Sequence, residues 1–203
     1  MLHSRGHNHA APNFNRAFAI GLVLNVVFVG VEATYGILTN SLALVADAGH
    51  NLSDVFSLLL AWGASLLATR KPTLRRSYGF RRATILASLI SALLLLVALG
   101  AIAWEAVDRF NQPRLLSGGT IIVVAGIGVV INTITALMFQ SGRKSDLNIR
   151  GAYLHMAADA GVSLGVAISG FMIMLTGWVW LDPTISLVIV AIILIGTWGL
   201  LRD

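Results

Sequence analysis

Long apolar runs separated by short polar stretches recur along the whole chain. Each run has roughly the 20 residues that a helix needs to cross about 30 Å of hydrocarbon. Helices satisfy their own backbone hydrogen bonds where water is absent, and the runs lack the short alternating pattern of barrel strands. The pattern predicts six membrane-spanning helices, at residues 16–38, 42–68, 82–108, 117–140, 151–177 and 182–201.

The same pattern predicts an all-α fold, a six-helix transmembrane bundle, with a single domain. Residues 1–15 form a polar tail that contains His3, His7 and His9, and residues 16–203 form the transmembrane domain. The tail has no apolar core, so we do not expect a cleavable signal peptide. Its histidines either belong to a polar segment that only precedes the first span or bind metal ions weakly.

Composition agrees with a membrane protein and excludes other classes. Hydrophobic residues make up 57% of the chain, and Asp, Glu, Lys and Arg only 11%. Ordinary soluble domains have about 25% charged residues. So few charges cannot form a water-facing exterior. The chain has no cysteine, which excludes disulfides and thiolate metal sites.

Positive charge is concentrated in alternate connections. Of the 14 Lys and Arg residues, all but Arg109 and Arg114 fall in the N-terminal segment, the loops after the second and fourth spans, or the C-terminal end. Positively charged loops remain in the cytoplasm, so we expect both termini to be cytoplasmic. The basic residues lie at the ends of the apolar runs, which favours a lipid bilayer over a nucleic acid as the partner. The basic cluster at 74–82 is an orientation anchor that could also hold anionic lipid headgroups.

The ionisable residues inside the apolar runs carry the functional information. A carboxylate at the centre of a bilayer costs about 2.5–3.5 kcal/mol on insertion scales, so such residues are functional candidates. The second span contains SLALVADAGHNLSDV, with His50 and Asp54. The fifth span contains LHMAADAGVSLG, with His155 and Asp159.

Both spans therefore carry H-x-x-x-D. Residues four apart lie on one face of a helix, so each motif presents an imidazole and a carboxylate to the same point. Two facing helices would supply two nitrogens and two oxygens, a set that suits tetrahedral zinc. Imidazole also suits other transition metals, whereas an oxygen-only set would favour magnesium, calcium or manganese. We predict a metal site formed by His50, Asp54, His155 and Asp159.

Neighbouring polar residues in the spans leave several interpretations open. Asp47 and Asn51 are candidates to support the site or to act as a way-station. Asp47 could hold a ligand imidazole in one tautomer, or bond to a neighbouring helix. Glu32, in the first span, could bond within the bundle or line an outward vestibule.

Two other functions compete with metal transport. A metal-dependent intramembrane enzyme would need an open coordination position and a nearby base, but four candidate ligands close the tetrahedron and no HExxH motif is present. We therefore expect no enzyme. A proton-conducting or structural bundle could use the same carboxylates without metal. A single His–Asp pair fits such a bundle well, and the second copy favours metal.

With these residues identified, the chain resembles the cation diffusion facilitators, and most closely their bacterial zinc, cobalt and cadmium resistance subgroup. The resemblance covers nearly the whole chain and depends on the paired H-x-x-x-D motifs. It implies a multi-pass protein of the bacterial inner membrane that exports Zn²⁺, with Cd²⁺ or Co²⁺ as other substrates, in exchange for protons. His50 occupies the position that the family associates with zinc preference.

The resemblance has further implications. Family members are typically homodimers, move the metal as a substrate by alternating access rather than keeping it as a cofactor, and usually continue into a cytoplasmic C-terminal domain. This chain ends at Leu200-Leu201-Arg202-Asp203, directly after the last predicted span. We therefore expect the cytoplasmic domain to be absent, together with any regulation that it provides.

Overall fold

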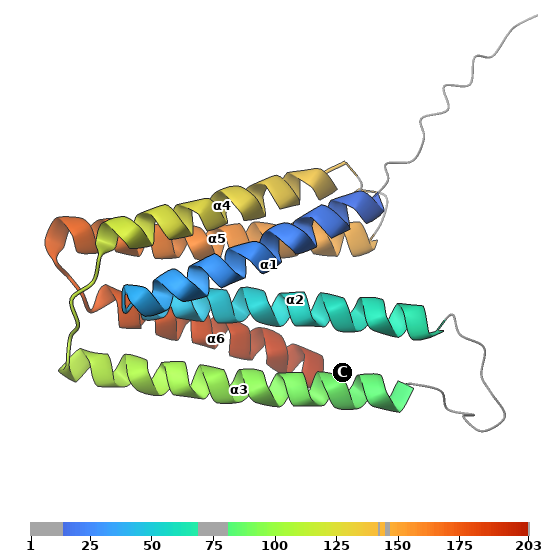
Figure 1. The fold of residues 1–203 in the computed structure, drawn as a ribbon, viewed down its shortest axis with the longest axis horizontal. Coiled ribbons are helices and arrows are strands. Elements are labelled where there is room, and N and C mark those ends of the chain that lie inside the picture. Colours follow the sequence, from blue (N-terminus) through green and yellow to red (C-terminus); the bar gives the residue numbers. More distant parts are fainter. Residues whose placement is uncertain (1–13, 69–80, 142, 145–146, 203) are drawn as a thin grey trace, which may run out of the picture.

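The computed structural model describes residues 14–68, 81–141, 143–144 and 147–202, and these form helices joined by short connections, with no strand (Figure 1). The helices are α1 (Phe14–Leu38), α2 (Leu42–Ala68), α3 (Arg81–Asn111), α4 (Gly118–Phe139), α5 (Leu147–Thr176) and α6 (Leu181–Arg202). Residues 1–13, with the three tail histidines, and residues 69–80 of the basic loop lie outside the described residues.

The helices alternate in direction, which gives the molecule two distinct ends (Figure 1). At one end, here called the turn end, α1 turns into α2, α3 leads to α4, and α5 leads to α6. The other end, here called the entry end, is where α1 begins and α2 and α4 finish. Helix α4 packs along α5, α1 along α2, and α3 along α6. Helix α2 also contacts α3, α5 and α6, so it is central to the bundle.

The predicted helices agree with the observed ones in number and order. The largest difference at a helix end is at α5, which begins at Leu147 rather than at 151. A helix does not have to end where its apolar run ends, because exposed polar side chains such as Arg150 are tolerated on its surface. Among the described residues, three segments are long and apolar enough to cross a membrane: Ala19–Leu38, Gly118–Phe139 and Ile149–Thr176.

Polar and apolar residues are distributed inside out relative to a soluble protein. Glu32, Asp47 and Asp159 are almost completely buried, whereas large apolar side chains such as Trp104 and Ile195 face outward. A soluble bundle would bury the apolar groups and expose the carboxylates. The arrangement is the one expected when lipid surrounds the helices and polar groups face the bundle interior.

Glycines of the spans differ in how closely a neighbouring helix approaches them. No atom of the described residues lies within 4 Å of a Cβ placed at Gly161 or Gly165, although their spacing is one that allows close helix approach. Helices α4 and α5 cross closely at Gly118 and Gly170. A Cβ on Gly170 would lie 2.7 Å from Ile121 Cγ2. Sequence spacing identifies small residues but not the face that meets a neighbour.

The α1–α2 connection is fixed by hydrogen bonds at both helix ends. Helix α1 ends with Asn40 in the left-handed region, at φ 55°, and the Ser41 N–H bonds to the Gly36 carbonyl at 2.9 Å, a Schellman arrangement. Ser41 then caps α2 by accepting from the Leu44 N–H at 3.3 Å. This connection determines where the central helix starts and therefore the depth of its ionisable residues.

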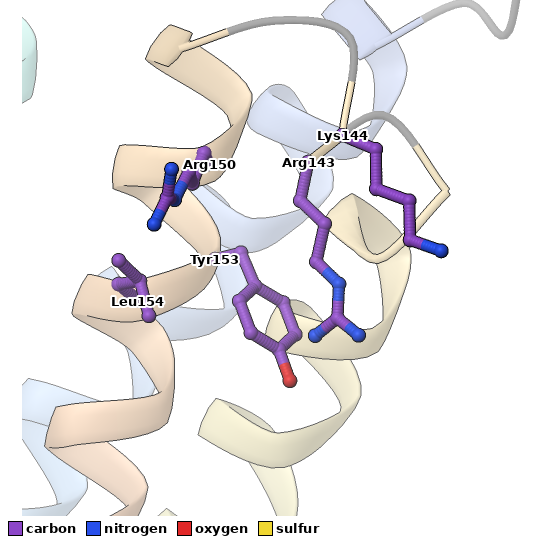
Figure 2. A pocket seen from close by; sticks show the side chains of 5 residues that line it. All are labelled: Arg143, Lys144, Arg150, Tyr153 and Leu154. Carbon is purple, nitrogen blue, oxygen red and sulfur yellow. The ribbon is translucent and has the colours of Figure 1, made fainter.

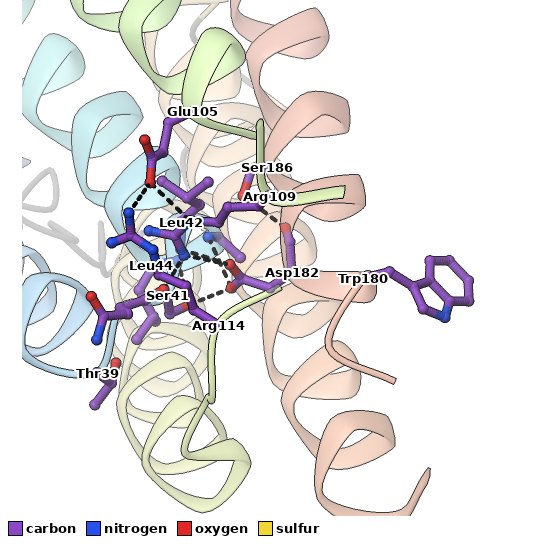
Figure 3. A network of polar contacts seen from close by, with 12 residues as sticks. Thr39, Ser41, Leu42, Leu44, Glu105, Arg109, Arg114, Trp180, Asp182 and Ser186 are labelled. Atoms are coloured by element: carbon purple, nitrogen blue, oxygen red, sulfur yellow. Dashed lines mark hydrogen bonds and ion pairs between the residues drawn. The ribbon is translucent and has the colours of Figure 1, made fainter. Parts of the chain in front are cut away.

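A buried polar cluster at the turn end joins this connection to α3 and α6 (Figure 3). The Asp182 carboxylate, on α6, accepts from the Ser41 hydroxyl at 2.5 Å and from the Leu42 and Ala43 N–H groups at 2.8 and 3.2 Å. Arg109, on α3, donates to the Asn40 carbonyl and lies 3.6 Å from Asp182. We call Ser41, Arg109 and Asp182 the Asp182 clasp.

Candidate metal centre

The two H-x-x-x-D motifs each place their side chains one helical turn apart, as their spacing predicts. On α2, His50 Nδ1 lies 3.7 Å from Asp54 Oδ2. On α5, His155 Nε2 lies 3.7 Å from Asp159 Oδ2. Each helix therefore carries one imidazole and one carboxylate on a shared face.

The two faces meet crosswise, so that each histidine contacts the carboxylate of the other helix. His50 Nε2 is 3.3 Å from Asp159 Oδ1, and His155 Nε2 is 3.3 Å from Asp54 Oδ2. The imidazole rings lie edge to face with centroids 6.3 Å apart. Ligand atoms of His50, Asp54 and Asp159 all lie within 4.8 Å of one another. The structure thus brings the four residues together in one alternating ring, here called the four-residue site.

Access to the four-residue site is uneven. The exposed fraction of the side chain is 41% for His155, 21% for Asp54, 16% for His50 and 2% for Asp159. His155 and Asp54 lie on the side of the site nearer the entry end, because α2 ends and α5 begins there. Exposure therefore decreases from the entry end toward the turn end.

Two carboxylate oxygens in the site have no hydrogen-bond donor among the described residues. These are Asp54 Oδ2 and Asp159 Oδ1, which face histidine nitrogens without a well-aligned hydrogen bond. Buried carboxylate oxygens are normally satisfied, because an unpaired buried charge is strongly destabilising. Their orientation suits an additional positively charged group at this point.

Asp47 and Asn51, which the sequence left open, bond to neighbouring helices. Asp47 Oδ2 accepts from the Ser163 hydroxyl on α5 at 2.8 Å. Asn51 donates its amide N–H to Glu32 Oε2 on α1 at 3.3 Å. Of the alternatives considered for Asp47, the structure therefore supports bonding to a neighbouring helix, and Glu32 bonds within the bundle.

Sequence reasoning did not assign a role to Ser163, Asn25 or Asn132. Ser163 follows Asp159 by one turn, which was a usable signal. Asn25 on α1 donates to the Met156 sulfur on α5 at 3.7 Å. Asn132 on α4 is fully buried, and neither of its amide atoms has a hydrogen-bond partner within the described part of the chain. Buried amides in apolar spans mark polar contacts between helices.

A separate cavity of about 350 Å³ lies near the connection between α4 and α5 and is lined by Arg143, Lys144, Arg150, Tyr153 and Leu154 (Figure 2). The Arg143 guanidinium carbon lies 4.4 Å from the centre of the Tyr153 ring. Three cations would repel a metal ion, so this cavity is not a second metal centre. It concentrates positive charge at the entry end.

Comparison with known proteins gives a family assignment. A family model described as the cation efflux transmembrane domain matches residues 18–203. The chain is 37% identical over 209 residues to the zinc transporter ZitB of Escherichia coli, covering 100% of this chain and 66% of that protein. It is 36% identical over 200 residues to the cadmium, cobalt and zinc/H(+)-K(+) antiporter of Bacillus subtilis, covering 98% and 64%.

A third relative is the metal cation efflux system protein CzcD of Cupriavidus metallidurans, which is 38% identical over 199 residues. That match covers 98% of this chain and 63% of CzcD. The chain spans just under two thirds of the length of these three relatives. It belongs to the cation efflux family, with relatives in the bacterial zinc, cobalt and cadmium subgroup, and is a multi-pass protein of the bacterial inner membrane.

Proposed function

We propose that the chain exports a divalent transition metal ion, with Zn²⁺ as the preferred substrate, from the cytoplasm in exchange for protons. The ion is held within the membrane by the four-residue site. The observation that carries this proposal is the crosswise contact of the two motifs at 3.3 Å. The comparisons establish the family, and the proposal adds the substrate, the metal-binding residues and the mechanism.

The distances in the site fit tetrahedral coordination. Bonds of 2.0–2.2 Å from a central zinc ion to its ligands separate neighbouring ligand atoms by about 3.4 Å. The four His–Asp separations are 3.3 or 3.7 Å. Because these separations involve both nitrogens of His50 and both oxygens of Asp159, side-chain rotations are needed to direct one atom of each residue to a shared centre.

Charge and ligand type agree with the same cargo. Asp54 and Asp159 supply two negative charges, which balance a divalent ion and compensate the cost of burying each charge alone. Two imidazoles favour zinc and its transition-metal neighbours over magnesium or calcium. Cd²⁺ and Co²⁺ are the alternative substrates, and two of the relatives named above carry zinc, or cadmium, cobalt and zinc, in their names.

We expect all six helices to cross the membrane. The shortest helices have 22 residues and are about 33 Å long at 1.5 Å per residue, enough to span the hydrocarbon. Arg143, Lys144 and Arg150 are at the entry end, which supports a cytoplasmic entry end with both termini on that side. Because exposure of the site decreases away from this end, we assign the structure to a state open to the cytoplasm.

Protons provide the driving force by competing for the same ligands. Metal binding requires deprotonated histidines and carboxylates, and an unperturbed histidine titrates near pH 6.5. When the helices rock to expose the site to the outer side, protonation of His50 and His155 releases the ion. The protonated site then returns inward, so that one cycle exchanges metal for protons.

The family assignment bears differently on the two competing functions. Membership of a family of cation transporters removes the metal-dependent enzyme. A proton-conducting bundle that holds no metal remains distinguishable by stoichiometry: purified wild-type protein should bind one strongly held Zn²⁺ ion that Asp159→Ala lacks. The homodimer implied by the resemblance stays a prediction, which the molar mass of the detergent-solubilised protein would test.

The direct experiment is a transport assay in proteoliposomes across zinc, cadmium, cobalt, iron and manganese. An imposed pH gradient should drive metal uptake by inside-out protein, with zinc among the best substrates. His155→Ala should abolish it. Leu154→Ala, a neighbouring outward-facing change, is the matched control and should retain transport. Unchanged transport in His155→Ala would refute the proposal.

A further inference from the structure

A second pair of acidic residues lies next to the four-residue site, on the side toward the turn end. Glu32 on α1 and Asp47 on α2 are both completely buried. Asn51 bonds to Glu32 at 3.3 Å, and Asp47 lies one turn before Asn51 on the same face of α2, so the two carboxyl groups are neighbours. Asp47 precedes His50 by three residues, so the pair is about one helical turn from the site. Neither residue belongs to the alternating His–Asp ring.

Each carboxyl group of the pair is held by one oxygen and free at the other. The Asn51 amide holds Glu32 Oε2, and the Ser163 hydroxyl holds Asp47 Oδ2. The remaining oxygens, Glu32 Oε1 and Asp47 Oδ1, have no hydrogen-bond donor within the described residues. The neutral donors fix both groups in position, and a further donor is needed between them.

The charged groups nearby in the described residues are already engaged. His50 on α2 faces Asp159 on α5 at 3.3 Å within the four-residue site. The buried Arg109 is engaged in the Asp182 clasp. Two ionised carboxylates that share one buried site repel strongly, and a single shared proton removes most of the cost.

We propose that Glu32 and Asp47 hold one proton between them and release it when metal binds, which makes them the proton-carrying partner of the four-residue site. This inference rests on the proposed metal–proton exchange and names residues for its proton. The pair has one negative charge when it shares the proton and two when the proton leaves for water. No other atom is transferred.

Electrostatics links the two sites. An incoming divalent ion about one turn away favours the doubly negative form of the pair, so the proton leaves as the metal arrives. Conversely, a proton arriving at the pair reduces the attraction for the ion. Metal and proton therefore displace each other without competing for the same atom, in addition to the direct competition at the histidines.

The number of protons released per Zn²⁺ bound tests this link. It can be measured by titration calorimetry of the full chain in buffers of different ionisation enthalpy. Glu32→Gln and Asp47→Asn keep the size and hydrogen-bonding capacity of each side chain but cannot share a proton in this way. We expect release to fall by about one proton per metal ion, zinc affinity to change less than fivefold, and pH-driven transport to fall at least tenfold.

The matched controls separate this role from a merely structural one. Glu105→Gln removes a carboxylate that is partly exposed at the turn end and should leave proton release unchanged. Glu32→Asp retains the acid and should restore the released proton. If both amide variants bind zinc and release as many protons as the wild type, the inference is wrong.

A second measurement uses wild-type protein, in case the variants do not fold. Infrared difference spectroscopy on addition of Zn²⁺ should show loss of the carbonyl band of a buried protonated carboxyl group, and its absence would overturn the inference. The proposed function fails differently: Asp159→Ala would then bind zinc as tightly as the wild type. The two failures are therefore distinguishable.

Discussion

Asp182 in the clasp and Asp159 in the four-residue site are both buried aspartates on helices of one bundle, but their surroundings differ. Asp182 accepts from one hydroxyl and two backbone N–H groups and faces Arg109. Asp159 keeps Oδ1 without a hydrogen-bond donor in the described part of the chain. One carboxylate is fully satisfied by the fold, and the other is left for an additional cation.

The difference separates structural from functional buried charge. The field at the start of α2 favours a negative group, and Asp182 with Ser41 satisfies the first N–H groups of that helix. Such a carboxylate contributes to stability when the protein is empty. The carboxylates of the four-residue site, by contrast, are positioned at a cost that binding of the metal would offset. The two kinds should therefore respond differently to substitution.

The largest expected effect is on stability, from Asp182→Ala. The substitution leaves the buried Arg109 without the Asp182 anion and the Leu42 and Ala43 N–H groups without their acceptor. Removing one partner of a buried pair costs about 3–5 kcal/mol. The free energy of unfolding, measured by denaturant titration in detergent micelles, should fall by that amount.

Asp182→Asn sharpens the same contrast, since the amide keeps one acceptor oxygen and should lose less stability. Zinc affinity of whatever fraction remains folded should be unchanged in both variants. Loss of zinc binding by folded Asp182→Asn would show that the clasp takes part in the metal centre, and the proposed separation of roles would fail.

The next largest effect is on metal affinity, from Asp159→Ala. Even the loss of a group that only supports a metal ligand costs 10–100-fold in affinity, so loss of a ligand should cost at least about 100-fold, or about 2.8 kcal/mol. Stability without metal should be equal or higher, because an unsatisfied buried carboxylate is removed. Equilibrium dialysis with zinc and unfolding without metal measure the two effects. A large loss of stability without metal would contradict the comparison.

The sequence was sufficient for the six helices and for the meeting of the two motifs. Apolar runs with polar ends locate helices in lipid, and a spacing of four residues places His50 with Asp54 and His155 with Asp159. Repetition of one motif in two spans was what made a shared site the preferred interpretation. All of these are local patterns, which a single sequence contains directly.

Contacts between helices could not be predicted in the same way. Asp182 was treated only as the opening of the last helix, although its partners are 139 to 141 residues away. The partner of Glu32 could not be predicted either, because Asn51 lies on another helix. The rotation of each helix about its axis decides such pairs, and nearly uniform apolar runs carry little information about that rotation.

Lowering the pH should weaken zinc binding at the four-residue site by a more moderate amount. Each histidine that must lose a proton before binding metal should weaken zinc binding as the pH falls from 7.5 to 5.5, by up to about tenfold for each pH unit below the pKa of that histidine. The sign follows because protons occupy the metal-binding nitrogens as pH falls. Zinc affinity measured across this range should show the loss, and His50→Gln should flatten it. A profile that is flat in the wild type would exclude histidine ligands.

The smallest expected effect comes from the exposed side of the clasp. Glu105 lies 3.1 Å from Arg109 and 3.2 Å from Arg114, but about a third of its side chain is exposed. Exposed ion pairs contribute about 0–1 kcal/mol, so Glu105→Gln should reduce the free energy of unfolding by less than 1 kcal/mol and leave zinc transport unchanged. The Asp182 carboxylate remains to hold Arg109 in this variant. A loss as large as that of Asp182→Ala would mean that Glu105, rather than Asp182, is the main anion that holds Arg109.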